Sequence, residues 1–199
     1  MFGAAELEWK KQPCQIFLND NNKKYADDFA RKNKLKIKNL IGIHMGAGPR
    51  WPSKAWSPEK VMEFIVKAKQ KGYEIILFGG PDEQEKLEPI AKALEKQNIT
   101  ICRNNPKNTK KEFASLVNLC RAVVCSDSLA LHVSLALGKP TIGLFFCTSP
   151  DEVEGYGLLK KIISPMLRNF FPEKMDKYDE KLVNSISADE VLNAVNSVK

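Results

Sequence analysis

Short apolar runs alternate with stretches of helical periodicity along most of the chain. In the stretches between the runs, apolar residues recur every three or four positions, which is typical of amphipathic helices. The runs predict strands, and the run from Glu74 to Phe78 is apolar almost throughout, as expected of a strand covered on both faces in a parallel sheet. The six predicted strands cover residues 40–45, 73–78, 99–102, 122–125, 141–145 and 161–163. The pattern therefore predicts an α/β fold with a doubly wound, mostly parallel sheet.

Capping residues mark several helix starts. They are Ser57 followed by Pro58, Thr109 with Glu112, and Ser187 with Glu190. Helices are also predicted over residues 19–35 and 188–198. Residues 164–184 are the least regular stretch, and we expect them to form a surface excursion before the last helix.

Composition narrows the function classes. The 199 residues, 43% of them hydrophobic, suffice for one domain with a full core. The net charge of +7 is spread along the chain and comes from 26 Lys against 5 Arg, whereas nucleic-acid binders concentrate charge and favour Arg. Five cysteines without a C-x-x-C pair and two histidines specify neither a disulfide framework nor a zinc site. No apolar run approaches the roughly 18 residues of a membrane span, so we expect a cytoplasmic protein.

The loop after the first predicted strand, residues 44–57, combines small residues with cations. Its candidate ligand-binding residues are Gly46, Gly48, Arg50, Ser53 and Lys54. Small residues let backbone N–H groups approach a ligand closely, and the cations suit a phosphate or diphosphate. The loop is neither a P-loop, since G-K-[ST] is missing, nor a G-x-G-x-x-G fingerprint. A tight turn with two tryptophans packed on the sheet explains the same residues without a ligand.

The fourth predicted strand runs directly into a helix that opens with Ser126, Asp127 and Ser128. Asp127 either caps this helix or binds ligand hydroxyls while the helix N-terminus faces an anion. His132 lies about one turn further on, where both a packed residue and a ligand contact are open interpretations.

Two other loops follow predicted strands. After the second strand, Glu83 or Glu85 is placed to present a carboxylate to a ribose diol, although a glycine turn with acidic residues at a helix start also explains them. The loop after the fifth strand carries hydroxyl side chains. If the strand order is 3-2-1-4-5, Lys54 and Asp127 flank the point where the order reverses and converge on one crevice.

Four segments resemble the ADP-heptose:lipopolysaccharide heptosyltransferases, a bacterial glycosyltransferase family. In chain order they are Ile41-Gly-Ile-His-Met-Gly-Ala-Gly48 with Lys54-Ala-Trp56, Leu77-Phe-Gly-Gly-Pro-Asp-Glu83, Asp127-Ser128 and His132 with Ala136-Leu-Gly-Lys-Pro-Thr141, and Thr148-Ser-Pro150. The match lies in the nucleotide-binding C-terminal half of the family's proteins. It implies the Rossmann-like domain of a GT-B glycosyltransferase over residues 39–199, with residues 1–38 as an interdomain segment that contains a helix.

The resemblance also implies a function. The domain would bind an ADP-activated sugar for transfer to lipopolysaccharide core, with Lys54 neutralising the diphosphate as its charge grows on bond cleavage. Glu83 would hold the ribose, Asp127 the sugar hydroxyls, and Ser128 and His132 would lie near the phosphates. No metal or other cofactor is implied, no nucleic acid is expected as a partner, and membrane contact would be at most peripheral, at the inner membrane.

Departures from the family pattern leave alternatives. Leu129 stands where the family usually has Gly, and Phe146-Cys147 where it has Gly-Pro, so we expect a narrower crevice or one shaped for a different sugar. The family's acceptor-binding half, which carries the general base, has no counterpart in this sequence, so transfer by the chain on its own is not expected. The alternatives are a degenerate anion-binding module, a nicotinamide-dependent domain, which the missing glycine fingerprint disfavours, and a basic module for nucleic acid or membranes.

Overall fold

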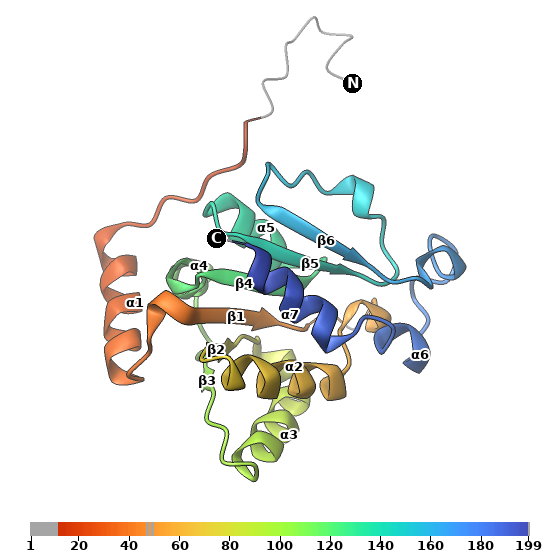
Figure 1. Ribbon diagram of the computed structural model, residues 1–199. Helices are drawn as coiled ribbons and strands as arrows, with labels where there is room; N and C mark the ends of the chain where they lie inside the picture. The colour runs from red at the N-terminus through yellow and green to blue at the C-terminus, as the bar shows by residue number, and fades with distance from the viewer. Residues whose placement is uncertain (1–11, 47, 49, 199) are drawn as a thin grey trace, which may run out of the picture.

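The computed structural model describes residues 12–46, 48 and 50–198. Within these residues, six parallel strands form one sheet in the order β3-β2-β1-β4-β5-β6 (Figure 1). The strands are β1 (Leu40–His44), β2 (Glu74–Leu77), β3 (Cys102–Arg103), β4 (Ala122–Ser126), β5 (Thr141–Phe145) and β6 (Leu159–Ile163). Successive strands are added outward from β1, first on one side and then on the other. The predicted doubly wound α/β class is confirmed.

Helices cover both faces of this sheet, with α7 in front of the strands in Figure 1. They are α1 (Asp20–Lys32), α2 (Pro58–Gln70), α3 (Gln84–Glu95), α4 (Lys110–Leu119), α5 (Leu129–Ala136), α6 (Glu180–Val183) and α7 (Ala188–Ser197). One core joins α2, α3, α6 and α7 to strand residues such as Ile43 and Val124. The other joins α1, α4 and α5 to the intervening strand residues, such as Leu40 and Val123. Because successive residues of a strand point to opposite faces, two such cores require strands that are apolar throughout.

The predicted helix starts lie where the capping residues indicated. The hydroxyl of Ser57 accepts the N–H three residues further along α2. Thr109 and Glu112 form a reciprocal capping box at the start of α4. At α7 the hydroxyl of Ser187 accepts the N–H of Glu190 at 3.2 Å. These bonds satisfy N–H groups that the first turn of a helix leaves without partners.

The third predicted strand is shorter than its apolar run. β3 is confined to Cys102 and Arg103, whereas Ile99 and Ile101 are partly buried against the core on the α2 side. An apolar run near the edge of a sheet looks the same whether its residues pair with the next strand or pack beside it, so the pattern placed the strand too early. β6 begins two residues before its prediction and carries exposed lysines, which suit an edge strand.

Residues 164–184 are not purely a surface excursion, and that expectation was wrong. Phe170, Leu182 and Val183 are buried, and α6 lies within this stretch. Charged residues between the apolar ones hid the buried positions from a periodicity argument.

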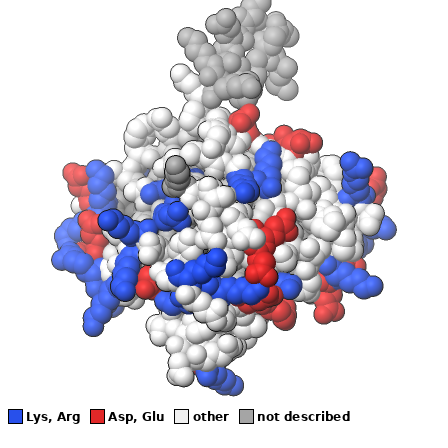
Figure 2. Space-filling view, in the orientation of Figure 1, with Lys and Arg blue, Asp and Glu red and all other residues white. Residues whose placement is uncertain are grey.

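The described residues that precede β1 pack against α4 and α5. Ala26 of α1 is buried with α4 in the second core, and Tyr25 and Phe29 pack beside it. The N–H of Ile16 donates to the carbonyl of Ala136 at the end of α5, 3.0 Å away. Figure 2 shows lysine and arginine side chains spread over one face of the molecule with acidic side chains between them, in agreement with the diffuse charge of the sequence. No helix in the described residues is long and apolar enough to cross a membrane.

Candidate functional site

The loops that follow β1 and β4 meet at one edge of the sheet. The two strands are neighbours, with His44 opposite Cys125 near their carboxyl ends, and the strand order reverses between them. Lys54 from the first loop forms an ion pair with Asp127 from the second, with 2.8 Å between Nζ and Oδ2. Their side chains are 15% and 19% exposed, so water screens this pair less than an ion pair on the open surface. The two residues thus lie together, as the strand order predicts.

The structure bears on one of the two interpretations of Asp127, that it caps α5. The cap position of α5 is Ser128, whose side chain makes no capping hydrogen bond, and the Asp127 carboxylate points to Lys54 instead of the helix. Asp127 is therefore not the cap of α5, and its carboxylate lies against Lys54. Leu129, the first residue of α5, remains 57% exposed beside it.

Residues distant in sequence hold Lys54 in place. The buried hydroxyl of Ser53 donates to the carbonyl of Lys177 at 2.8 Å and accepts the N–H of Asp179 at 2.9 Å. The indole N–H of Trp56, which is 1% exposed, donates to the carbonyl of Ile186 at 3.1 Å. These bonds fix both ends of the short turn that carries the lysine.

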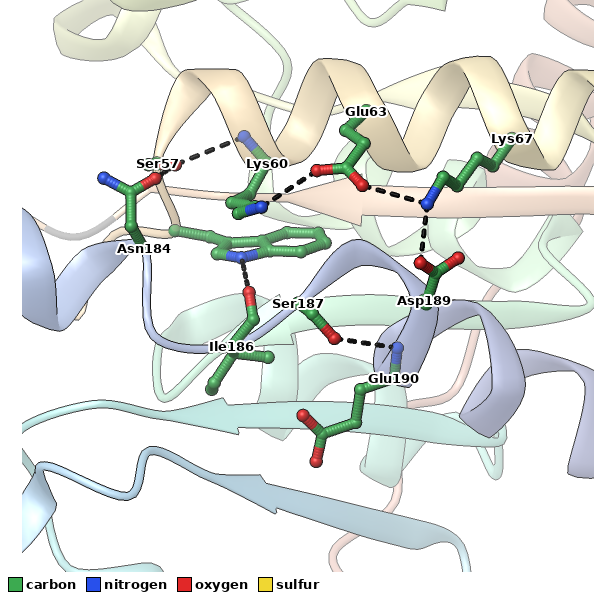
Figure 3. A network of polar contacts seen from close by, with 10 residues as sticks. Ser57, Lys60, Glu63, Lys67, Asn184, Ile186, Ser187, Asp189 and Glu190 are labelled. Atoms are coloured by element: carbon green, nitrogen blue, oxygen red, sulfur yellow. Dashed lines mark hydrogen bonds and ion pairs between the residues drawn. The ribbon is translucent and has the colours of Figure 1, made fainter.

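The neighbouring start of α2 is tied to the segment before α7 (Figure 3). The hydroxyl of Ser57 lies 2.6 Å from the side-chain oxygen of Asn184. Further along the helix, Lys67 binds Glu63 of α2 and Asp189 of α7 at 2.9 Å and 2.7 Å. The turn that carries Lys54 is thus followed directly by a helix that is bonded to the C-terminal segment.

The carboxylate of Glu83 lies beside Gly46, at the start of the loop that follows β1. Its Oε2 accepts the N–H of Gly80 at 2.6 Å and lies 3.7 Å from Nε2 of His44. A Cβ at Gly46 would overlap the carboxylate, so only glycine leaves room for it at that position. Glu85, the alternative from the sequence, is exposed in the first turn of α3. Of the two carboxylates, Glu83 is the one that lies beside Gly46 and His44.

A cavity of about 220 Å³ opens beside Glu83. It is lined by His44, Gly79, Gly80, Pro81, Glu83, Asn104, Pro106, Asn108, Lys110, Phe113 and Leu129. His44 packs edge-on against Phe113, with 6.2 Å between ring centres. The sequence analysis did not identify four of these residues as lining a cavity, namely His44, Asn104, Asn108 and Phe113. The position of His44 at the end of a strand beside the reversal point was the available signal.

Buried polar atoms without a protein partner gather at this edge. Within the described residues they are Nδ1 of His44 and the hydroxyls of Ser126 and Ser128. Burial lowers the pKa of His44, although the nearby Glu83 opposes this shift, so the ring is held neutral. A buried polar group without a partner is costly, and such groups are often satisfied by a ligand or water.

The remaining candidates are placed differently. Gly48 is exposed, as is Arg50, whose guanidinium stacks over Trp51 at 4.8 Å from the ring centre. His132 is exposed and lines another cavity, with Glu152 and Tyr156, so the structure does not bring it to Lys54. The hydroxyl of Ser53 is hydrogen-bonded to the backbone at residues 177 and 179, and it stabilises the conformation of the turn that carries Lys54.

The loop after β5 begins with two buried side chains. Phe146 and Cys147 are 1% and 0% exposed, and burial raises the pKa of the Cys147 thiol to about 11, while Lys54 opposes and Asp127 adds to this shift. No cluster of three or more His, Cys, Asp or Glu residues in the described chain is arranged to hold a metal ion.

Comparisons with known proteins identify the family. A model described as glycosyltransferase family 9 (heptosyltransferase) matches residues 2–181. Lipopolysaccharide heptosyltransferase 2 of Salmonella typhimurium is 34% identical over 113 residues, which make up 56% of this chain and 32% of that protein. Lipooligosaccharide heptosyltransferase 2 of Haemophilus ducreyi is 27% identical over 176 residues, 85% of this chain and 49% of that protein.

A solved structure shows the same fold. That of the ADP-heptose LPS heptosyltransferase II of E. coli covers 98% of this chain and 56% of its own, with a TM-score of 0.77 and 24% identity. The chain spans half or less of the length of the two curated relatives named above. Over the part that it shares with them, the chain belongs to glycosyltransferase family 9, the heptosyltransferases.

Proposed function

We propose that residues 39–199 form the donor-binding domain of a heptosyltransferase-like GT-B enzyme, and that it binds an ADP-activated sugar. The ion pair between Lys54 and Asp127 at the reversal point carries this proposal. An entering diphosphate competes with Asp127 for the ammonium group of Lys54. The carboxylate that is released then accepts hydrogen bonds from hydroxyls of the sugar.

Lys54 acts on the bond that breaks. When an acceptor hydroxyl attacks the anomeric carbon, the bond between that carbon and the diphosphate oxygen breaks and its electron pair stays on the diphosphate. A fixed cation stabilises this growing charge more than it stabilises the intact donor. The short turn held by Ser53 and Trp56 keeps the ammonium group in place, which limits the reorganisation needed during the reaction.

The cavity beside Glu83 suits the nucleoside. The Glu83 carboxylate is an acceptor for the two ribose hydroxyls, and Phe113 offers an aromatic surface to a base. The name of the E. coli neighbour includes ADP-heptose as its donor, which favours adenine here. An acceptor-binding half outside this sequence is proposed to bind the acceptor, lipopolysaccharide core, and to supply the general base. The chain by itself then binds the donor without transferring the sugar.

Calorimetric titration of ADP, UDP and GDP tests the proposal. ADP is expected to bind in preference, and Lys54→Ala to weaken it about 10- to 100-fold, the range of a contact between ionised groups. Lys92→Ala is the control, because Lys92 makes an exposed ion pair with Glu88 on α3. The affinity is expected to be equal with Mg²⁺ and with a chelator, since no metal is proposed. If none of the three nucleotides binds, the alternative of a degenerate module replaces the proposal.

A further inference from the structure

A hydrogen-bonded chain connects α1 to the turn that carries Glu83. It begins at the hydroxyl of Tyr25, which lies 2.6 Å from Nδ2 of Asn108, the donor. Oδ1 of Asn108 lies 3.3 Å from Nδ2 of Asn104, whose two hydrogens are shared with the carbonyls of Gly79 at 3.3 Å and Asn105 at 2.8 Å. These three side chains are half-buried and come from α1 and from the loop between β3 and α4.

The side chain of Asn104 makes two hydrogen bonds to the backbone of Gly79. Its Oδ1 accepts the N–H of Gly79 at 2.9 Å, and its Nδ2 lies 3.3 Å from the carbonyl of the same residue. The next residue, Gly80, donates its N–H to the Glu83 carboxylate. The orientation of the peptides on either side of Gly79 therefore determines where the carboxylate sits.

Other bonds in the described structure hold the residues on either side of Gly79: the N–H of Phe78 donates to the carbonyl of Ile43 at 2.7 Å, and the N–H of Glu83 donates to the carbonyl of Gly80 at 3.2 Å. Gln84 donates to the carbonyl of Gly80 at 2.9 Å, which holds the start of the next helix but not the peptide of Gly79. Gly79 has no side chain to anchor it, and a Cβ there would overlap Leu87. The hydrogen bonds from the side chain of Asn104 therefore fix the backbone of Gly79.

From this geometry we infer that Tyr25 is a positioning residue for the nucleoside part of the donor, acting through Asn108, Asn104 and the Gly79-Gly80 turn on Glu83. The inference rests on the proposed function for its ligand. It assigns a task to α1, which precedes the sheet and contributes no residue to the cavity beside Glu83. A displacement of α1 is transmitted to the ribose carboxylate, whereas Lys54, held by residues 177–186, does not respond.

The test removes one oxygen atom. Tyr25→Phe keeps the ring that packs in the second core and deletes the hydroxyl at the start of the chain. Tyr73→Phe is the matched control, because the Tyr73 hydroxyl also links two elements, donating to Asn196 of α7 at 2.9 Å, but it contacts neither the cavity nor this chain. The first measurement is amide hydrogen exchange at Gly79 and Gly80 by NMR without ligand.

Exchange at these two amides is expected to become about 3- to 10-fold faster in Tyr25→Phe and to stay unchanged in Tyr73→Phe, a range set by one neutral hydrogen bond. The dissociation constant for ADP is expected to rise by a similar factor, while that for inorganic pyrophosphate stays constant. Unchanged exchange, an equal effect in Tyr73→Phe, or an equal loss of pyrophosphate binding overturns the inference. Faster exchange in a protein that binds no ADP would instead uphold the chain of bonds and overturn the proposed function.

Discussion

Replacing Gly46 with alanine is expected to displace the Glu83 carboxylate while the sheet stays intact. The new Cβ would overlap the carboxylate and lie 3.1 Å from the ring of His44. The obstacle is the end of a flexible side chain, so the carboxylate rotates away and the backbone stays. The bond of 2.6 Å from the Gly80 N–H to Oε2 is then lost.

The size of the effect follows from that bond. A hydrogen bond to a charged group contributes about 1.5–3 kcal/mol, and Glu83 is only 21% exposed, so solvent replaces little of it. Alanine restricts the unfolded chain and returns about 0.4–1 kcal/mol. The net loss in the free energy of unfolding is about 1–2 kcal/mol, which lowers the melting temperature of a protein of this size by about 2–8 °C.

Gly48 offers a control in the same loop, because a Cβ there would meet nothing within 4 Å. Gly48→Ala is expected to leave the melting temperature unchanged or to raise it slightly. Thermal unfolding, with titrations of ADP and of pyrophosphate, separates the two variants: Gly46→Ala loses ADP affinity and retains pyrophosphate binding. Adding Glu83→Ala to Gly46→Ala should have little further effect, since both remove the same contact. Equal stability and equal ADP affinity in the two alanine variants would refute the placement of Glu83.

Two further predictions concern stability. Because burial lowers the pKa of His44, folding favours the neutral ring, so the contribution of His44 to the free energy of unfolding is complete above pH 6.5 and falls as the pH drops below that value. Urea midpoints measured between pH 5 and 8 should show this slope in the wild type and a weaker slope in His44→Gln. Parallel curves for the two proteins would contradict the prediction. Trp56→Phe leaves the carbonyl of Ile186 unpaired and leaves space beside Phe64, so it should lower the free energy of unfolding by about 2–4 kcal/mol. Trp51 is more exposed, and Trp51→Phe should lower the same free energy by under about 1 kcal/mol. Similar urea midpoints for the two variants would disprove the prediction.

The sequence predicts the parts of the site that depend on topology. Apolar runs and helix caps place β1 and β4, and the common strand order of such sheets then brings Lys54 and Asp127 together. These features are local, or follow from a rule of connection, so a single sequence contains them.

The parts that depend on tertiary contacts could not be predicted. The small residues around Ser53 predict a ligand contact, whereas the bonds of its hydroxyl to the backbone of residues 177 and 179, more than a hundred positions away, leave no signal in the sequence. His132 has the same spacing from Asp127 whether it faces the crevice or solvent, and only the packing of α5 decides. That Glu83 lies beside Gly46 likewise could not be predicted, because Gly46 belongs to another loop.

The dependence of the Lys54 turn on residues 177–186 has a consequence for biosynthesis. A ribosome delivers the chain from its N-terminus, so strands β1 to β5 can pair while the carbonyl groups that receive Ser53 and Trp56 are still inside the exit tunnel. Ser53 and Trp56 acquire these partners only when residues 177–186 have left the tunnel. The turn that carries Lys54 therefore reaches its final hydrogen bonding only after the first five strands have been free to pair.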